Sequence, residues 1–340
     1  MRSGNLTDWG FMKAKIIWAL TDGKAGMINQ ARGLASAIAR EIGGKVVEKV
    51  VVPQAPWSFL PAGFWPPGIS GAGYGSDDIG APWPEIVVSC GRHAIGPAVW
   101  IKRKNEGRTA IVHAQNPGTA SRQFNLIVAQ SHDALKGANV IIVQGSMHDI
   151  TNGSLSAARQ KWSDKFVGLS RPLVAVLIGG SNKTYRMTAD VTRQMADDLL
   201  RMKAANGCGL LVTASRRTGK ENWMVLRDML SQPDVYFWDG NGDNPYQAFL
   251  AMADAFLVSA DSVNMVSEAC FTGKPVYILP LEGGAGSKFE RFHLEMRDAG
   301  HTRTFVGDLE DWSPYRLDQT TVAAREIAIR LTGDGSTQVD

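Results

Sequence analysis

Two adjoining stretches decide the fold of this chain: Val258-Ser-Ala-Asp-Ser-Val-Asn-Met-Val-Ser-Glu-Ala-Cys270 and Phe271-Thr-Gly-Lys-Pro-Val-Tyr-Ile-Leu-Pro280. They predict a strand end, a polar turn, a helix and a second apolar strand. The short side chains of Ser259, Asp261 and Ser262 suit the cap of a helix start. Glu268 lies near the same helical face as Asp261, seven residues further on. Backbone N–H groups at a helix start suit a phosphate, and a carboxylate can accept hydrogen bonds from ribose hydroxyls, so the stretch predicts a nucleotide-diphosphate site.

Short apolar strands alternate with helical patterns on both sides of this stretch. The first series begins at Lys15–Leu20, followed by a helix at Gln30–Ile42, and the second begins at Leu173–Ile178. Continuous β-branched strands between helices are typical of parallel sheets covered on both faces. We therefore predict an α/β protein with two doubly wound, Rossmann-like domains facing a cleft. The expected boundaries are an arm at 1–13, domains at 14–168 and 169–318, and a C-terminal helix and tail at 319–340.

The composition excludes several classes of protein. Of the 340 residues, 44% are apolar and 20% charged, which is typical of a soluble globular chain. The net charge of +3 does not favour nucleic acid as a partner, and the three cysteines lack the spacing of a zinc site. The sequence has no membrane-length apolar run and no apolar signal core at its start. We expect a cytoplasmic protein, with peripheral attachment to the inner face of the membrane as the alternative.

Glycine or small polar residues follow several predicted strands, where open parallel sheets usually build ligand sites. Gly179, Gly180 and Ser181 follow one strand, and Ser215 and Arg216 follow the next. Backbone N–H groups at such glycines can approach phosphate oxygens, although glycine after a strand is also ordinary turn chemistry. The GxGxxG and GxxxxGK[ST] patterns are absent, which disfavours a dehydrogenase or a P-loop protein.

Several motifs carry a resemblance to known proteins. They are Leu20-Thr-Asp-Gly-Lys-Ala-Gly-Met-Ile-Asn-Gln-Ala-Arg-Gly-Leu34, Ser89-Cys-Gly-Arg-His93, His113-Ala-Gln-Asn-Pro117, Ile178-Gly-Gly-Ser181, Ser215-Arg-Arg-Thr218, and Ser259–Glu268 with Thr272-Gly-Lys-Pro275. The chain resembles the GT-B glycosyltransferase superfamily and, within it, the elongated-mitochondria (mitochondrial fission factor-like) family. Bacterial members of that family often carry the name of nucleoside-diphosphate-sugar epimerases. The resemblance covers residues 14 to 305.

The resemblance implies a nucleoside-diphosphate sugar held mainly by the C-terminal domain, with the N-terminal domain on the acceptor side. Ser262 and the nearby backbone would hold phosphate and Glu268 the ribose; alternatively, Glu268 faces solvent and Asp261 only caps the helix. The implied activity is a metal-independent glycosyl transfer without a cofactor, to a saccharide or lipid-linked acceptor. An epimerase is the first alternative, but a full set of carboxylates around the sugar is missing from the N-terminal domain. A partner-binding protein without catalysis is the second.

Candidate acceptor-side residues gather after the first strand. Asp22, Lys24, Asn29 and Gln30 surround one strand-to-helix turn. Asp22 is a candidate to take a proton from an acceptor hydroxyl, and the other three to contact acceptor or phosphate. A plain turn or cap role for Asp22 is the alternative.

Two histidines and an arginine complete the candidate set. His93 and His113 are candidates for a general base or a pyrophosphate contact, because histidine titrates near physiological pH, although each could be a packing residue. Arg92 is a candidate phosphate ligand, with an ordinary salt bridge as its alternative.

A segment rich in proline and aromatic residues, Pro53–Gly68, interrupts the alternating pattern. Trp57, Phe64 and Trp65 within it are candidates for contact with a lipid surface or an apolar acceptor. The alternative is that the loop folds back and buries its rings as a small cluster.

Overall fold

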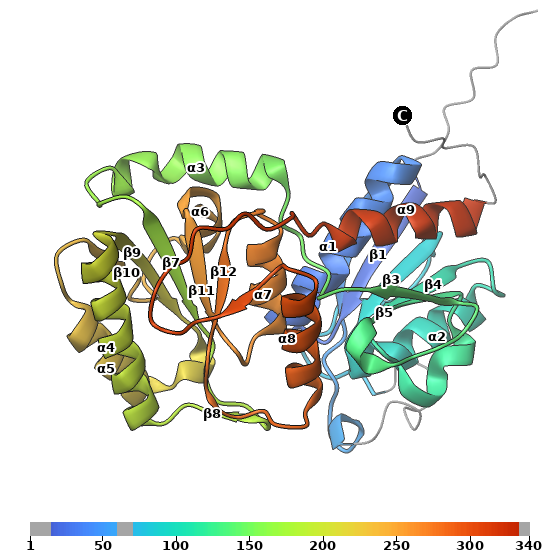
Figure 1. The fold of residues 1–340 in the computed structure, drawn as a ribbon. Helices are drawn as coiled ribbons and strands as arrows, with labels where there is room; N and C mark the ends of the chain where they lie inside the picture. The colour runs from blue at the N-terminus through green and yellow to red at the C-terminus, as the bar shows by residue number, and fades with distance from the viewer. Residues whose placement is uncertain (1–14, 60–70, 333–340) are drawn as a thin grey trace, which may run out of the picture. The chain divides into compact units, whose positions relative to one another are not determined.

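The computed structural model describes residues 15–59 and 71–332 (Figure 1). The chain forms two compact units. The first unit comprises the chain up to His113, the segment Pro117–Leu126 and the end of the chain from Ala324. The second comprises Ala114–Asn116 and Ile127–Ala323. Two six-stranded sheets organise the structure, as the alternating pattern predicts, and the expected domain boundaries remain predictions.

The first sheet has the strand order β2-β1-β3-β4-β5-β6. Its strands are β1 Lys15–Thr21, β2 Gly44–Val50, β3 Ile86–Cys90, β4 Ala110–Ala114, β5 Leu126–Gln130 and β6 Val140–Val143. Because β2 pairs with one side of β1 and β3 with the other, both in parallel, the direction of winding reverses between β1 and β3. Ligands of open α/β sheets bind outside the carboxyl ends of the strands at such a reversal.

Helices and short 3₁₀ turns connect these strands. They are α1 Ala25–Ile42, α2 Ile95–Lys104, and 3₁₀ turns at Trp57–Phe59, Arg92–Ala94, Gly118–Gln123 and Ser131–Asp133. α1 ends where Gly43 adopts a φ of 71° and donates its N–H to the carbonyl of Ala39, a glycine end that L side chains disfavour. α1 begins five residues before the predicted Gln30, because Lys24 at its start makes no side-chain cap that the sequence would reveal.

The second sheet has the order β10-β9-β7-β11-β12-β14. Its strands are β7 Leu173–Ile178, β9 Gly209–Ala214, β10 Val235–Phe237, β11 Ala255–Ser259, β12 Val276–Leu279 and β14 Arg303–Thr304. A small antiparallel pair, β8 Tyr185–Arg186 with β13 Glu282–Gly283, lies apart from it. The winding of the large sheet reverses between β7 and β11, which pair in parallel.

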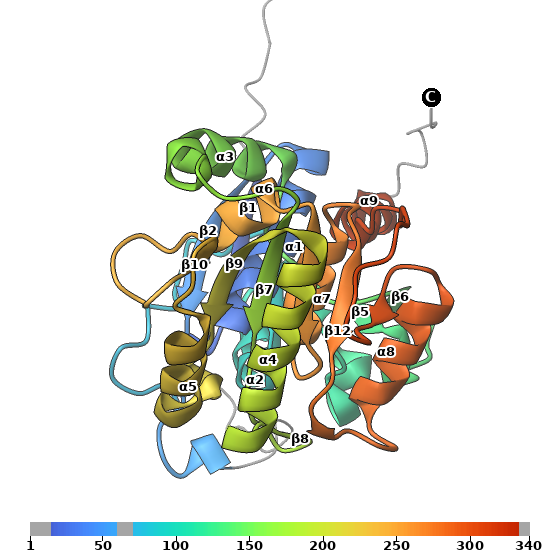
Figure 2. The same ribbon diagram turned by 60° about the vertical axis from the view of Figure 1, so that its left-hand side comes forward.

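Both faces of the second sheet are covered. The accompanying helical segments are α3 Asn152–Phe166, α4 Ala189–Asn206, a 3₁₀ turn at Arg216–Thr218, α5 Lys220–Leu230, α6 Tyr246–Met252, α7 Val263–Cys270 and α8 Lys288–Asp298. The last helix is α9 Gln319–Thr332, and from Ala324 its residues belong to the first unit. Every residue of β7 is buried, and alternate residues enter two different cores. Leu173, Ala175 and Leu177 belong to a core that includes side chains of α6, α7 and α8. Val174, Val176 and Ile178 belong to a second core with side chains of α4 and α5, which lie on the near side of the sheet in Figure 2. This is the two-faced burial that unbroken apolar strands predict.

In the described part of the chain, no helix is long and apolar enough to cross a membrane.

Candidate functional site

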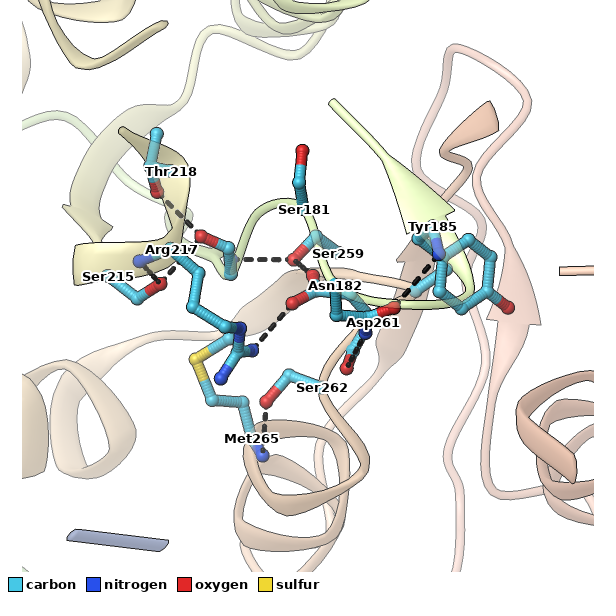
Figure 3. A network of polar contacts seen from close by, with 12 residues as sticks. Ser181, Asn182, Tyr185, Ser215, Arg217, Thr218, Ser259, Asp261, Ser262 and Met265 are labelled. Carbon is cyan, nitrogen blue, oxygen red and sulfur yellow. Dashed lines mark hydrogen bonds and ion pairs between the residues drawn. The ribbon is translucent and has the colours of Figure 1, made fainter. Parts of the chain in front are cut away.

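Three loops of the second sheet meet at the carboxyl ends of β7, β9 and β11 (Figure 3). Gly179 is the residue on which they converge. Its N–H donates to Oγ of Ser259 over 2.7 Å, and its carbonyl accepts from the hydroxyls of Ser215 and Thr218, each over 2.6 Å. The backbone N–H and carbonyl of one glycine therefore connect the loops after all three strands, at the reversal point of this sheet.

The carboxylate of Asp261 is the charged member of this network. Its side chain is fully buried. Oδ1 accepts a hydrogen bond from the hydroxyl of Ser259 over 2.6 Å, and Oδ2 accepts from Nη2 of Arg217 over 2.5 Å. Asp261 thus has a partner on each oxygen and holds the loop after β9 against the start of α7, rather than presenting both oxygens to a ligand.

Gly179 and Gly180 are required by close packing within the network. A Cβ atom at Gly179 would lie 2.2 Å from the carboxylate oxygens of Asp261. At Gly180, where φ is 144°, it would lie 2.1 Å from the carbonyl oxygen of Arg217. The N–H groups of Gly179 and Ser181 both donate inside the network, the latter to Arg217 over 3.2 Å. Gly179 and Gly180 therefore allow the loop after β7 to pack closely against the loops after β9 and β11. This packing by itself requires glycine at both positions, whether or not a phosphate binds.

Two candidate groups of this loop region lie at the surface. Ser181 is exposed, and its Oγ accepts from the N–H of Met187 over 2.9 Å. Arg216 and its neighbour Arg217 are also exposed, and Arg217 makes the ion pair with Asp261. The sequence motif Ser-Arg-Arg-Thr did not reveal which arginine pairs with Asp261, because that depends on the 3₁₀ turn at this point.

The helix α7 begins beside the network. Ser262 caps it as predicted, and its Oγ accepts from the N–H of Met265 over 3.4 Å. Glu268 is buried, and Tyr246 of α6 donates its hydroxyl to Oε2. Burial and the charge of Glu268 raise the pKa of Tyr246 well above its ordinary value, so the phenol stays protonated. Tyr246 is a partner that sequence reasoning missed, because nothing in the sequence connects positions 22 residues apart on different helices.

A cavity of about 270 Å³ adjoins the same strand ends. Ala260 and Tyr185, which flank the network, line it together with His293 of α8. Nε2 of His293 donates to the carbonyl of Ala260 over 2.7 Å. Burial lowers the pKa of His293, so the ring is neutral, and its Nδ1 has no partner among the described residues.

The first sheet has a polar pair at its own reversal point. Asp22 follows β1 and His93 follows β3, and Nδ1 of His93 donates to Oδ2 of Asp22 over 2.9 Å. Lys24 forms an ion pair with the same oxygen. Burial alone would raise the pKa of Asp22, but the hydrogen bonds from Lys24 and His93 hold it below its ordinary value, so Asp22 is a carboxylate at neutral pH.

The other nitrogen of His93 lies beside Arg92 and Ser58. Nε of Arg92 donates to Nε2 of His93 over 3.0 Å, and the carbonyl oxygen of Ser58 lies 3.3 Å from the same nitrogen. Nη2 of Arg92 also donates to the carbonyl of Ser58 over 2.8 Å. Arg92 is itself exposed. The arrangement is an aspartate that orients an imidazole, whose second nitrogen faces an arginine at the surface.

His113 lies apart from this pair. It is 1% exposed, its Nδ1 is 2.8 Å from Oγ of Ser89, and its ring packs against Phe124 at 5.1 Å between centroids. Burial lowers its pKa to about 3. His113 is therefore a neutral interior residue, the packing role that the sequence left open, and we leave it out of the site.

The remaining predicted residues of this region, Asn29 and Gln30, contact other side chains. Asn29 accepts from Nη2 of Arg32 over 3.4 Å. Gln30 is buried and accepts from the thiol of Cys90 over 3.7 Å.

The aromatic segment is described only in part. Trp57 is half-buried in a 3₁₀ turn, while Phe64 and Trp65 lie outside the described residues. Trp83, further along the chain, packs against Trp18 and Trp100 with centroids 6.3 and 5.7 Å apart.

Over residues 15–59 and 71–332, no group of three or more His, Cys, Asp or Glu side chains is arranged to hold a metal ion.

Sequence comparison identifies relatives of the whole chain. The family profile described as Mitochondrial fission ELM1 matches residues 25–331. The Arabidopsis thaliana protein named Mitochondrial fission protein ELM1 is 32% identical over 278 residues, which cover 74% of this chain and 65% of the Arabidopsis protein. The chain thus spans less than two thirds of that relative. A Rickettsia prowazekii (strain Madrid E) protein, named Uncharacterized protein RP120, is 24% identical over 356 residues, covering 93% of this chain and 98% of the relative.

Solved structures share the fold at low identity. The UDP-GlcNAc 2-epimerase of Methanocaldococcus jannaschii matches with a TM-score of 0.58 at 12% identity, covering 94% of this chain and 100% of that one. The UDP-GlcNAc 2-epimerase of Neisseria meningitidis, solved bound to UDP-GlcNAc, matches with a TM-score of 0.54 at 12% identity and the same coverage. These matches show the GT-B type of fold, two Rossmann-like sheets in one chain.

Proposed function

Because the chain belongs to the mitochondrial fission ELM1 family and has the GT-B fold, we propose that it binds a nucleoside-diphosphate sugar and transfers the sugar to a hydroxyl acceptor. The observation that carries the proposal is the meeting of three loops on Gly179 at the reversal point of the second sheet. A structure of the same fold is solved with UDP-GlcNAc bound, which supports the choice of ligand.

The nucleotide would lie against the second sheet. The start of α7 offers the positive end of a helix dipole to a diphosphate. The exposed guanidinium of Arg216 and the exposed hydroxyl of Ser181 are the side chains available beside it. Asp261 and Glu268 act behind these groups, because both are buried and hydrogen-bonded to protein partners. Glu268 would bind a ribose only if its carboxylate accepts hydrogen bonds from the ribose and from Tyr246 together.

In this proposal the Asp22–His93 pair supplies the proton acceptor. The acceptor hydroxyl loses its proton to Nε2 of His93 as its oxygen bonds to the anomeric carbon of the sugar. The bond between that carbon and the diphosphate oxygen breaks, and the nucleoside diphosphate leaves with the electron pair. Asp22, ionised and hydrogen-bonded to Nδ1, stabilises the imidazolium that forms. Arg92 must first release Nε2.

A thermal-shift screen with UDP, GDP, CMP, dTDP and their sugar conjugates tests ligand binding directly. A ligand that binds only the folded state raises the melting temperature. Replacing Arg216 by Ala should weaken the affinity for the active nucleotide about tenfold, the loss expected for one charge-assisted hydrogen bond. Arg193→Ala is the matched control, because Arg193 is an exposed arginine of α4 paired with Asp190 three residues earlier. The absence of a shift with every nucleotide would overturn the proposal.

Epimerisation of the same donor is the second candidate. It is favoured by the two solved structures of the same fold, both of which are UDP-GlcNAc 2-epimerases. Product analysis separates the two reactions, because an epimerase converts the sugar nucleotide without an acceptor and transfer requires one. Binding without any turnover would instead support a partner-binding protein, as the mitochondrial fission name of the Arabidopsis relative suggests.

We propose a cytoplasmic location for the chain. Peripheral membrane contact through the segment around Trp57, and a lipid-linked acceptor, are the further possibilities to test with liposomes.

A further inference from the structure

A second cavity, of about 260 Å³, lies at the amino ends of β11 and β12. Its wall includes Ala251 at the end of α6, which precedes β11, and Lys274 in the turn that precedes β12. The loops around Gly179 follow their strands, so this cavity lies at the opposite edge of the second sheet. In Figure 1, α3 and α6 lie together at this edge. The residues that line it are Asn152, Leu155, Ser156, Arg159, Leu250, Ala251, Phe271, Thr272, Lys274 and Arg316.

Three of the lining residues are cations, and none is an acid. Each cation is fixed by an uncharged partner. Arg159 donates to the carbonyl of Ala251, and Lys274 donates to the carbonyl of Ala253. The guanidinium of Arg316 lies over the ring of Phe271, 3.9 Å from its centroid.

The position of Arg316 is also set by the backbone. The N–H of Leu317 donates to the carbonyl of Cys270 over 3.1 Å, which anchors the segment beside the end of α7. Gly273, with a φ of 73°, lets this segment pass close by, because a Cβ there would lie 3.4 Å from Cβ of Arg316. The cationic wall is therefore built by the fold and needs no ligand to assemble it.

Carboxylates occur in the surroundings of the wall, since the charges of Asp149, Asp318 and Arg316 all act on His148. Across the two described stretches, 15–59 and 71–332, the three cations nevertheless form no ion pair and contact uncharged groups instead. The carboxylate of Asp254 does act on Lys274, but it is paired with Arg171 over 2.8 Å. Burial, with the charges of Arg159 and Arg171, lowers the pKa of Lys274 despite Asp254. A bound anion would remove this repulsion.

The start of α3 adds a further positive contribution. α3 is 15 residues long and begins at Asn152, which lines the cavity. Thr151 accepts the N–H of Ser154 in a capping box, and the dipole of the helix places partial positive charge at this end. The same face continues through Leu155 to Arg159.

We propose that this cavity binds the phosphate group of a small phosphate monoester. A phosphate monoester carries about two negative charges at neutral pH, which suits three cations better than a carboxylate does. Leu155, Leu250 and Phe271 form an apolar side of the cavity for the rest of the ligand. The site is separate from the proposed nucleotide site and does not depend on it.

Protection of Lys274 from acetylation tests the proposal on the full chain. The protein is treated with an amine-acetylating reagent in phosphate or in chloride at equal ionic strength, and each lysine is followed by mass spectrometry. Phosphate should slow acetylation of Lys274 about fivefold, because a bound anion covers the amine and favours its charged form. Lys45, an exposed lysine of β2, is the internal control and should react equally in both buffers. Equal slowing of both lysines, or none, would overturn the proposal.

Three further measurements sharpen the test. Arg316→Gln should raise the phosphate concentration needed for protection about fivefold, while Arg193→Gln should leave it unchanged. The melting shift given by a nucleotide should be the same in both variants, which separates this site from the proposed function. Phenyl phosphate should protect Lys274 at a lower concentration than inorganic phosphate if the apolar side takes part of the ligand. Undiminished protection in Arg316→Gln would refute the assignment of the cationic wall.

Discussion

Nδ1 of His93 donates a hydrogen bond to Asp22 over 2.9 Å, although 71 residues separate the two in the chain. The contact exists because β1 and β3 pair in parallel and release their following loops side by side. Between β3 and His93, Gly91 adopts a φ of 86° and packs against Met27, where a Cβ would lie 3.2 Å from the Met27 side chain. Sheet order, more than local sequence, therefore creates this pair.

Replacing Asp22 by Asn should destabilise the protein by about 1–3 kcal/mol, because a neutral amide cannot serve both the ammonium of Lys24 and Nδ1 of His93. Urea unfolding at pH 7.5 measures the change. Asp190→Asn, which removes an exposed carboxylate paired with Arg193, should cost less than about 0.5 kcal/mol. Equal losses in the two variants would contradict a structural role for the buried pair.

Stability should fall as the pH drops below about 6.5, the ordinary pKa of histidine. Burial lowers the pKa of His113 to about 3 and that of His148 to about 4, so the folded state excludes protons that the unfolded chain binds. Each histidine should contribute a slope of about 1.4 kcal/mol per pH unit between its two pKa values. Unfolding by urea at pH 7.5, 6.0 and 5.0 checks this.

The free energy of unfolding of the His113→Leu variant should fall less steeply with decreasing pH, because its unfolded chain binds one proton fewer. The slope should be smaller by about 1.4 kcal/mol per pH unit. Ser89 keeps its hydrogen bond to the carbonyl of Val112 in that variant. Identical slopes for the two proteins would mean that His113 does not titrate on unfolding.

Gly180→Ala should destabilise the second unit by about 3 kcal/mol or more, since the added methyl group meets the carbonyl of Arg217 at a φ that L residues rarely adopt. Gly168→Ala is the matched control, because a Cβ at Gly168 meets nothing within 4 Å. Thermal unfolding of both variants measures the difference. A melting temperature unchanged in Gly180→Ala would show that the two loops are not held at this distance.

Arg217→Ala should cost about 1–3 kcal/mol, because it leaves the buried carboxylate of Asp261 with one partner. Arg216→Ala, one position earlier and exposed, should leave unfolding in the absence of ligand unchanged. A double-mutant cycle with Asp261→Asn should give a coupling energy of about 1 kcal/mol or more. Additive losses would place Arg217 outside the network.

The architecture could be predicted from the sequence, since unbroken apolar strands such as Leu173–Ile178 indicate a sheet covered on both faces. It also indicated which loops hold small and polar residues, because these follow the strands directly. The sequence could not identify the hydrogen-bond and ion-pair partners of these residues, because the partners come from distant elements that the sheet brings together. Tyr246 with Glu268, and Arg217 rather than Arg216 with Asp261, are examples. His113 stands after a strand as His93 does, and only burial distinguishes an interior ring from one paired with a carboxylate.

The backbone of Gly179 restricts how this part of the protein can evolve. Ser215, Thr218 and Ser259 all bond to the backbone of that one residue, and the carboxylate of Asp261 fills the space beside its α-carbon. A new side chain in any one of the three loops therefore disturbs the other two. Homologues with a different ligand should differ here by coordinated sets of replacements, and single replacements at Gly179 should be rare among functional descendants.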